Sequence, residues 1–354
     1  MNIDNLDPNF KVETSKIKEN NNTFTLPCEE ISLYGTMYDY NIGCFQRMDH
    51  KIAKSIDYNK EVLSSTTAGA RAKFCTNARE ITLSVKYRYL VEMSTMPKLG
   101  ASGFTLFEND GTFNKYVAYF MPLFGDKEGF VQTKKLPGNE MREYVLYFPL
   151  YNDYITEVSI SFNEDAIVKP GRKYRGDLPI LYYGSSITQG GCASRPDNCY
   201  QAYISTWNDY DYLNLGFSGG AKGEDLMIEY LSNIKSKVFV CDYDHNAPTT
   251  EHLRNTHYKL YRAYRDKNSD TPIIFMTMPN VERPEATQNR KVIKGTYTKA
   301  KRDGDNNVYF IDGRKLFGKE DIEHCTTDLT HPNDLGFYRI AKVLNRVIAP
   351  LLKD

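Results

Sequence analysis

Three short segments in the second half of the chain carry the residue types that acyl transfer requires. Residues 184–188 read Gly-Ser-Ser-Ile-Thr and offer a hydroxyl nucleophile, and residues 214–219 read Asn-Leu-Gly-Phe-Ser-Gly and offer a backbone hydrogen-bond donor. Residues 328–333 read Asp-Leu-Thr-His-Pro-Asn and offer a base with a carboxylate three residues before it. Nucleophile, oxyanion donor and base are the parts that this chemistry needs. Their joint presence in this order predicts a serine-dependent reaction at an acyl group, whereas one segment alone would be weak evidence.

The predicted nucleophile is Ser186, which follows an apolar run in a glycine-containing turn. A serine hydroxyl attacks only when a base takes its proton, and His331 is the predicted base. Asp328 would accept a hydrogen bond from one imidazole nitrogen and leave the other free for the serine proton. A second pair with the same spacing, Asp321 and His324, stands seven residues earlier. The later pair is favoured because Pro-Asn and a strong helical pattern follow it directly, although each residue alone could be an ordinary turn position.

The predicted oxyanion hole combines three hydrogen-bond donors, of which the backbone amide of Ser186 is the first. Gly219 follows the second predicted strand, and its amide can approach a ligand because no Cβ stands in the way. Asn246 follows the third strand and could donate from its side-chain amide. Each donor of this kind changes the rate by about a hundredfold or more. Taken separately, a loop glycine and a turn-capping asparagine would be simpler explanations of the last two residues.

The composition gives no reason to expect nucleic acid or a membrane as a partner. Lys plus Arg and Asp plus Glu number 45 each among 354 residues, so the formal net charge is zero. No apolar run is long enough to span a bilayer, and the N-terminus does not resemble a signal peptide, so a cytoplasmic protein is expected. The seven cysteines have no metal-ligand spacing; Cys192 and Cys199 could pair across a loop, but free thiols are expected.

The first half of the sequence predicts β structure. Residues 80–89 alternate apolar and polar side chains, which is typical of a strand with one buried face. Two further apolar runs flank Asp110-Gly111, a dipeptide that is favoured in hairpin turns. Residues 142–148 and 157–162 have the pattern of two more strands, and no helical pattern interrupts them. Many short strands without helices favour an all-β sandwich or jelly roll, which we assign to residues 1–172.

The pattern changes after a polar link at residues 169–177. Short apolar runs now alternate with helical patterns, and the final helix carries apolar residues at i, i+3 and i+4 spacing from Phe337 to Leu351. This alternation predicts an α/β domain at residues 173–354, with a parallel sheet covered on both faces. In such sheets the reactive groups gather at the carboxyl ends of the strands, and each of the three segments begins at or after such an end. The predicted strands are residues 179–183, 212–217, 238–241, 273–276 and 308–311.

The three segments resemble the conserved blocks of the SGNH, or GDSL-like, hydrolase family. The resemblance covers roughly the second half of the chain and implies a flavodoxin-like three-layer α/β/α domain. By position it makes Ser186 the nucleophile and Asp328 and His331 its partners. It also makes Gly219 and Asn246 oxyanion donors, together with the amide of the nucleophile.

Two positions depart from the pattern of that family. Ser185 stands where the first block usually has Asp. The third block, usually Gly-x-Asn-Asp, reads Asp-Tyr-Asp-His-Asn at residues 242–246, so Asn246 is assigned by its position alone.

A β-sandwich ahead of such a domain is similar to the architecture of two-domain carbohydrate esterases. This similarity implies that the chain removes acetyl groups from xylan- or mannan-type sugars, with the sandwich shaping the substrate site. An acetylated oligosaccharide is then the expected partner, and the serine mechanism needs no metal or organic cofactor. Arg195 and Asp197, in the loop after the nucleophile, could bind sugar hydroxyls, although solvated surface charges would look the same in the sequence.

Other hypotheses stay open at this point. Ser218 lies in a Gly-x-Ser-x-Gly sequence typical of α/β-hydrolases, but only one predicted parallel strand precedes it, whereas that fold normally has several. An esterase or lipase of other acyl esters, or an inactive sugar-binding protein, could use the same scaffold. A metal-dependent hydrolase could use a loose cluster of side chains whose spacing matches no metal motif, namely Asp242, Asp244, His245, His252 and His257.

Overall fold

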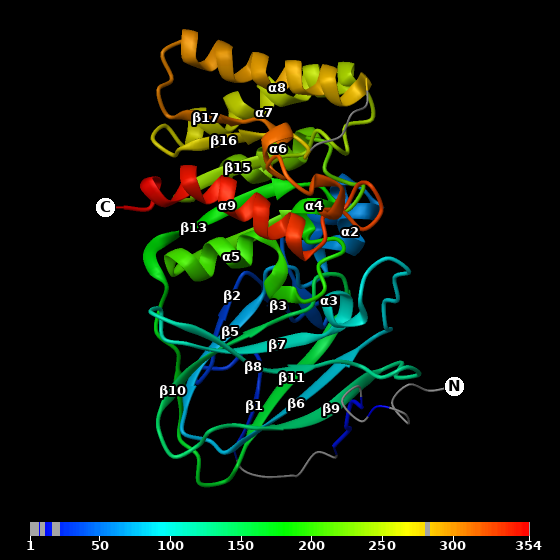
Figure 1. The fold of residues 1–354 in the computed structure, drawn as a ribbon, viewed down its shortest axis with the longest axis vertical. Coiled ribbons are helices and arrows are strands. Elements are labelled where there is room, and N and C mark those ends of the chain that lie inside the picture. Colours follow the sequence, from blue (N-terminus) through cyan, green and yellow to red (C-terminus); the bar gives the residue numbers. More distant parts are fainter. Residues whose placement is uncertain (1–6, 8–10, 16–21, 280–283, 354) are drawn as a thin grey trace.

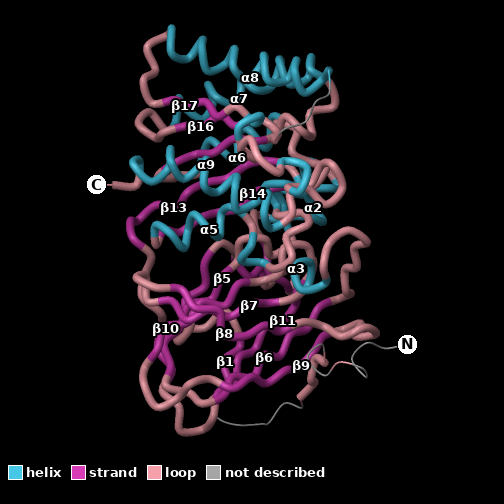
Figure 2. The backbone as a smooth tube through the Cα atoms, viewed as in Figure 1, coloured by secondary structure: helices cyan, strands magenta, loops and turns pink. Residues whose placement is uncertain are grey.

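The structure, a computed structural model, describes residues 7, 11–15, 22–279 and 284–353. It has two parts that lie end to end (Figure 1). One part is built of antiparallel strands, and the other has a parallel sheet between helices (Figure 2). The predicted combination of an all-β sandwich and a three-layer α/β/α domain is therefore confirmed.

The antiparallel part consists of two packed sheets. Its strands are β1 (Thr23–Thr25), β2 (Ser32–Tyr34), β5 (Arg71–Thr76), β6 (Glu80–Tyr87), β7 (Phe104–Asn109), β8 (Asn114–Phe120), β9 (Gly129–Lys135), β10 (Arg142–Tyr147), β11 (Ile155–Phe162) and β12 (Val168–Pro170). One sheet has the order β1-β11-β6-β9, and the other has the order β12-β5-β10-β7-β8, with β2 also paired to β5. Ile81, Leu83 and Val85 of β6 are buried in the core between the sheets, as their alternation predicts.

Strand β6 ends two residues before the alternating pattern does. The neighbouring strand β11 begins at Ile155, which pairs with Tyr87. The pairing between the two strands therefore ends at Tyr87. Tyr89 is 47% exposed as a result. The turn at Asp110-Gly111 joins β7 to its antiparallel neighbour β8, which confirms the predicted hairpin.

Helices interrupt the strands of the first half, which the sequence pattern did not predict. The additional elements are β3 (Met37–Asp39), β4 (Cys44–Gln46), α1 (His50–Ile56), α2 (Tyr58–Ser64) and α3 (Lys98–Ser102). The side chains of Asp49 and Asp57 accept backbone amides at the starts of α1 and α2 and so cap these helices. Helices of five to seven residues are too short to show an apolar period in the sequence.

Residues 47–64 belong to the first half of the chain but pack on the parallel-sheet part. Met48 and Ala53 are buried in the same apolar cluster as Tyr183 and Met227 from the second half. The antiparallel sheets end with β12 at Pro170, and the parallel sheet begins at Arg175. The two parts are therefore joined by this packing as well as by the connecting chain.

The parallel sheet places three loops at one edge. Its strands are β13 (Arg175–Gly184), β14 (Tyr210–Gly216), β15 (Val238–Asp242), β16 (Ile273–Met276) and β17 (Val308–Ile311), each close to a predicted strand. The order is β14-β13-β15-β16-β17. Gly184, the last residue of β13, is in register with Gly216 of β14 and Asp242 of β15. Because the chain passes from β13 to β14 and then crosses to β15, the order reverses here, and such reversals are where open α/β sheets bind ligands.

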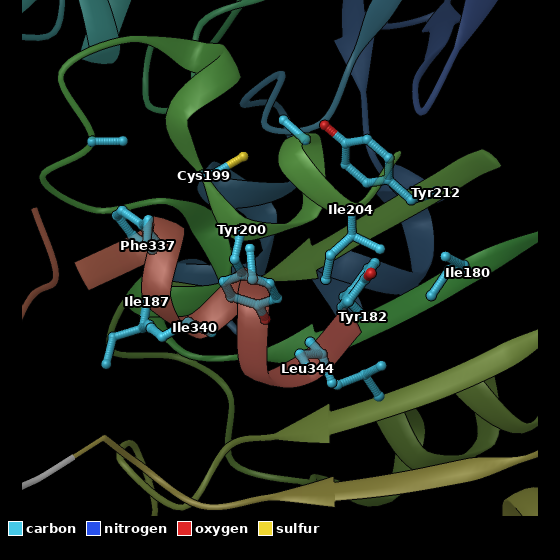
Figure 3. Close-up of a cluster of buried hydrophobic side chains, with 14 of the residues drawn as sticks. Ile180, Tyr182, Ile187, Cys199, Tyr200, Ile204, Tyr212, Phe337, Ile340 and Leu344 are labelled. Atoms are coloured by element: carbon cyan, nitrogen blue, oxygen red, sulfur yellow. The ribbon is translucent and has the colours of Figure 1, made fainter. Parts of the chain in front are cut away.

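Helices cover both faces of this sheet. One face carries α5 (Tyr200–Asn208) and α9 (Asp334–Leu351), and the other carries α6 (Asp225–Asn233), α7 (Thr250–Lys267) and α8 (Pro284–Arg302). Figure 3 shows the first face, where Tyr182 of β13 lies near Ile204 of α5 and Leu344 of α9. Leu181, next to Tyr182 in the strand, is buried on the other face. No helix of the described residues is both long and apolar enough to cross a membrane.

Arg47 ties the helical segment of the first half to the parallel sheet. Its guanidinium is buried and donates hydrogen bonds to three backbone carbonyls: Leu63 at 2.6 Å, Asn214 at 2.8 Å and Gly216 at 2.8 Å. The last two acceptors lie at the end of β14, where the second predicted catalytic segment begins. Burial lowers the pKa of Arg47 to about 9.

We expect Arg47→Ala to lower the free energy of unfolding by about 2–4 kcal/mol, because buried carbonyls lose their donor. The matched control is Arg88→Ala, since Arg88 also donates to a backbone carbonyl, at 2.8 Å, but is exposed. That control should change stability by no more than about 0.5 kcal/mol. Denaturant unfolding of both variants measures the difference, and equal losses would contradict the role given to Arg47.

Candidate active site

Ser186 is the first residue of α4 (Ser186–Gln189), directly after β13. The turn that leads to it is crowded: a Cβ on Gly184 would lie 2.1 Å from Thr188 Oγ1 and 2.2 Å from the carbonyl oxygen of Asp242. Only glycine fits at that position. Ser185 caps α4 by accepting a backbone amide at 3.2 Å, and its own amide donates to Asp242 at 3.2 Å. These contacts hold Ser186 at the edge of the sheet.

The structure brings the three predicted catalytic side chains into one hydrogen-bonded chain. Ser186 Oγ lies 2.8 Å from His331 Nε2, and His331 Nδ1 lies 2.7 Å from Asp328 Oδ2. Since the ionised carboxylate only accepts, Nδ1 carries the imidazole proton and Nε2 can accept the proton of the serine. This is the arrangement of nucleophile, base and orienting acid that serine hydrolases use.

The surroundings of Asp328 keep its carboxylate ionised. Partial burial alone would raise its pKa, but hydrogen bonds from the amide and imidazole of His331, and from the amide of Thr330, lower that pKa below its ordinary value. Leu329 has a φ of +66°, and this left-handed conformation turns the two amides toward the carboxylate. The loop therefore orients the base with its own backbone.

The start of α9 holds the histidine loop in place. Asn333 caps the helix by accepting the amide of Gly336 at 3.1 Å, and its side-chain amide donates to the carbonyl oxygen of His324 at 2.7 Å. The amide of Thr327 donates to the carbonyl oxygen of His331 at 2.9 Å. The earlier Asp-x-x-His pair thus supports this loop through its backbone, and the exposed side chain of His324 is not the partner of Ser186.

The three predicted oxyanion donors follow three adjacent strands. Ser186 comes two residues after the last residue of β13, Gly219 three after that of β14 and Asn246 four after that of β15. Because these last residues are in register, the donors leave the sheet at the same edge. Their joint action on one oxyanion stays a prediction.

The turn around Gly219 is held on both sides. The amide of Ser218 donates to Gln189 Oε1 at 3.0 Å, and the amides of Gly220 and Ala221 donate to the carbonyl oxygen of Phe217. Gly219 itself is exposed, has a φ of +67° and has open space where a Cβ would stand. Its conformation favours glycine and leaves its amide accessible to a ligand.

Asn246 contacts the same turn from the next strand. Its Oδ1 accepts the amide of Ala221 at 3.4 Å, so the NH₂ side of the amide is turned away from this contact. The side chain is half-buried. These features are those expected of a third hydrogen-bond donor beside Gly219.

Ser218, the alternative nucleophile, has other contacts. Its amide donates to Gln189 Oε1 at 3.0 Å, and its carbonyl oxygen accepts from Asn59 Nδ2 at 3.0 Å. His331 is paired with Ser186 instead. The geometry therefore favours Ser186 over Ser218 as the nucleophile.

Arg195 and Asp197, predicted to bind substrate, are engaged by the protein. Arg195 Nη2 lies 2.9 Å from Asp197 Oδ2, and the guanidinium stacks over the ring of Tyr116 from the sandwich at 4.5 Å. Asp197 also accepts the hydroxyl of Thr105 at 2.8 Å, from β7. These contacts favour a role in joining the two parts, and the predicted sugar contacts stay untested.

The ligands of the alternative metal site do not converge. His257 is buried and bonds a threonine hydroxyl, His252 bonds a backbone carbonyl, and Asp244 accepts a backbone amide. Asp242 accepts the hydroxyl of Thr188 instead. No three of the five candidate residues, all of them described, place their ligand atoms within 4.8 Å of one another. The geometry thus gives no support to a metal-dependent hydrolase at this cluster.

The sandwich supplies the walls of a pocket of about 420 Å³. Its lining residues are Val91, Glu92, Met93, Ser94, Met96, Lys98 and Phe124. Thr95, between two of these residues, accepts a hydrogen bond from the thiol of Cys192 at 3.7 Å. The sulfur of Cys192 lies in turn within 4.8 Å of ligand atoms of Asp328 and His331.

Sequence patterns did not reveal the residues by which the first half supports the site. Arg47 and Asn59 hold the second catalytic segment by side-chain hydrogen bonds to its backbone. Thr95, also of the first half, accepts a hydrogen bond from the thiol of Cys192 in the second half. Cys192 and Cys199, a possible pair in the sequence, are both free thiols. None of these residues belongs to a local motif, so only their contacts identify them.

Two family models match the chain, one for each part. Residues 177–349 match the GDSL-like Lipase/Acylhydrolase family, and residues 24–168 match the N-terminus of Esterase_SGNH_hydro-type. No curated protein matches the chain.

Solved structures of the same two-part architecture also match. A protein from Bacteroides ovatus ATCC 8483 described as a GDSL-like lipase is 27% identical, with a TM-score of 0.82 over 94% of this chain and 98% of that one. The salicylyl-acyltransferase SsfX3 from a tetracycline biosynthetic pathway is 16% identical, with a TM-score of 0.74 over 93% and 97%. The acetyl xylan esterase Est2A from the rumen bacterium Butyrivibrio proteoclasticus is 13% identical, with a TM-score of 0.61 over 93% and 98%.

Fold, site and family matches define a class of protein, the serine ester hydrolases. Within that class the chain belongs to the SGNH, or GDSL-like, hydrolases and carries the N-terminal domain found with esterases of this type. Ser185, which stands where the family usually has Asp, supplies the cap of α4 in this chain.

Replacing Ser186 by Ala should lower kcat on an aryl acetate by at least about a thousandfold, because the acyl-enzyme cannot form. Ser218→Ala, the matched control, should keep kcat within about tenfold of the parent, since His331 is paired with Ser186 and not with Ser218. Steady-state kinetics and labelling by a fluorophosphonate measure both effects. Loss of labelling in Ser218→Ala, but not in Ser186→Ala, would overturn the assignment.

Activity should rise from acid toward neutral pH, because His331 accepts the serine proton only when it is neutral. The pKa of Asp328 is lowered, so its carboxylate is already ionised there and adds no second step. Asp328→Asn should keep Ser186 labelled slowly but lower kcat by about a hundredfold to ten-thousandfold. A kcat/KM profile that is flat from acid to neutral pH would count against this mechanism.

Proposed function

We propose that this esterase is a carbohydrate O-acetylesterase, acting on acetylated oligosaccharides of the mannan or xylan type. The observation that carries the proposal is the position of the pocket. It is walled by sandwich residues, among them the polar Glu92 and Ser94 and the exposed ring of Phe124. Thr95, in the same segment, contacts Cys192, whose sulfur lies within 4.8 Å of ligand atoms of Asp328 and His331. A sugar presents both hydroxyls and an apolar ring face, and this mixture of polar and aromatic groups suits it.

The structural neighbours support the same substrate class. They include the acetyl xylan esterase Est2A and a family two carbohydrate esterase from Clostridium thermocellum solved with cellohexaose, the latter with a TM-score of 0.61 and 16% identity. At these identities the likeness concerns the fold alone. The substrate is therefore inferred from the pocket and the fold together.

The proposed reaction has two steps. Ser186 Oγ attacks the acetyl carbonyl while His331 Nε2 takes its proton, and the amides of Ser186, Gly219 and Asn246 stabilise the oxyanion. The bond between the acetyl carbonyl carbon and the sugar oxygen breaks, and His331 gives its proton to that oxygen, which leaves as a sugar hydroxyl. Water, deprotonated by His331, then attacks the acetyl-enzyme and releases acetate and free Ser186.

Cytoplasmic location is part of the same proposal. All seven cysteines, Cys192 and Cys199 included, are free thiols. Unpaired cysteines suit a reducing compartment.

A second candidate is an esterase of longer acyl chains, because the neighbour with the higher identity, 27%, is described as a lipase. Release of acid from acetylated xylan and mannan oligosaccharides, acetylated chitin and aryl acetate, butyrate and octanoate separates the two. We expect kcat/KM to be highest on an acetylated oligosaccharide, at least about tenfold above aryl octanoate. Ser186→Ala supplies the background rate. Hydrolysis of octanoate without any of the acetylated sugars would favour the second candidate.

Phe124→Ala tests the pocket within this assay. The ring is 91% exposed, so its loss should raise KM for the oligosaccharide by about tenfold through lost stacking while kcat on aryl acetate stays unchanged. Phe113→Ala, at a phenylalanine that is 44% exposed and does not line the pocket, is the matched control. Equal effects of the two substitutions on KM would show that this pocket does not bind the oligosaccharide.

A further inference from the structure

Cys192 lies beside the catalytic base and has no part in acyl transfer. Its sulfur, one carboxylate oxygen of Asp328 and one ring nitrogen of His331 all lie within 4.8 Å of one another. The residue is 5% exposed and has a φ of +72°, a left-handed conformation that is uncommon for residues other than glycine. A strained backbone at this place has no explanation in the esterase mechanism.

The loop around Cys192 is firmly placed against the histidine loop. The amide of Ser194 donates to Asp334 Oδ1 at 2.8 Å, at the start of α9, and the amide of Ala193 donates to Gly190 at 3.1 Å. The thiol itself contacts the hydroxyl of Thr95. The sulfur is therefore held near the imidazole by contacts within its own loop and by two other segments, the start of α9 and the sandwich residue Thr95.

We propose that Cys192, Asp328 and His331 form a binding site for Zn²⁺, and that zinc bound there reversibly inhibits the esterase. Thiolate, imidazole and carboxylate are the ligand types that zinc prefers, and three protein ligands leave a fourth position for water. The side chains of Asp328 and His331 are 29% and 27% exposed, so the ion can enter from solvent although the thiol is buried. The thiolate and the carboxylate together neutralise the charge of the ion.

The inhibition follows from the tautomer of His331 and so rests on the proposed serine mechanism. Nδ1 is the ring nitrogen on the side of Asp328, 2.7 Å from its carboxylate, and is the one that zinc would take. The neutral imidazole must then carry its proton on Nε2, which can no longer accept the proton of Ser186. The thiol releases its proton to solvent as the zinc–sulfur bond forms. Removal of zinc restores the thiol, the Nδ1 proton and the active base.

The test measures zinc binding and activity separately, on the full chain. Equilibrium dialysis should find one Zn²⁺ per chain, and saturating zinc should lower kcat/KM on aryl acetate at least tenfold, with full recovery after EDTA. Cys192→Ala should keep its uninhibited activity, bind zinc at least tenfold more weakly and resist inhibition. Cys75→Ala, at a half-buried free thiol in the sandwich, should behave as the parent does. Cys192→Ser, closer in size to the native residue, gives a second reading if the alanine variant is unstable.

Ser186→Ala separates this inference from the proposed function. It should bind zinc as the parent does, because the serine is not a ligand, and Co²⁺ in its place should give a thiolate-to-metal charge-transfer band that Cys192→Ala lacks. If the parent protein binds zinc through Cys192 but has no esterase activity, the zinc site is supported and the proposed function is refuted. Esterase activity with equal zinc binding in Cys192→Ala and the parent would refute the site and keep the function.

Discussion

The chain of hydrogen bonds from Asp328 through His331 to Ser186 depends on one constraint: two loops 145 residues apart must leave the same edge of a parallel sheet. Parallel pairing meets this constraint because every strand ends at the same side. The register of β13 with β14 and β15 then brings Gly219 and Asn246 to that edge. A strand displaced in this sheet would separate the groups of the site even if every side chain were kept.

The N-terminal half takes part in the site through contacts rather than through chemistry. Arg47 and Asn59 hold the backbone of the second catalytic segment, and Thr95 contacts Cys192. Arg195, a neighbour of the nucleophile loop, stacks on a ring of the sandwich. The second part is thus packed against the first through contacts with the second catalytic segment and with the loop that follows the nucleophile.

Much of the fold and the catalytic chain could be predicted from short patterns. The strands of the parallel sheet show as apolar runs because both of their faces are buried, and α9 shows its period over 18 residues. Helices α1 and α2, of seven residues each, are too short to show one, so the first half was predicted without helices. Arg195 and Asp197 were predicted to face substrate because the sequence does not indicate that their loop packs on the sandwich.

What the sequence by itself determined is the chemistry: a serine, an imidazole and a carboxylate. Each of them lies within a short local pattern that indicates its chemical role without knowledge of the rest of the fold. What only the tertiary structure decided is which residues from distant segments lie next to these groups. The thiol of Cys192 beside the base, the carbonyls that Arg47 satisfies and the pocket wall from residues 91–98 all join segments far apart in the chain. These contacts arise where the two parts of the protein pack against each other. A local sequence pattern cannot predict which residues meet across that interface.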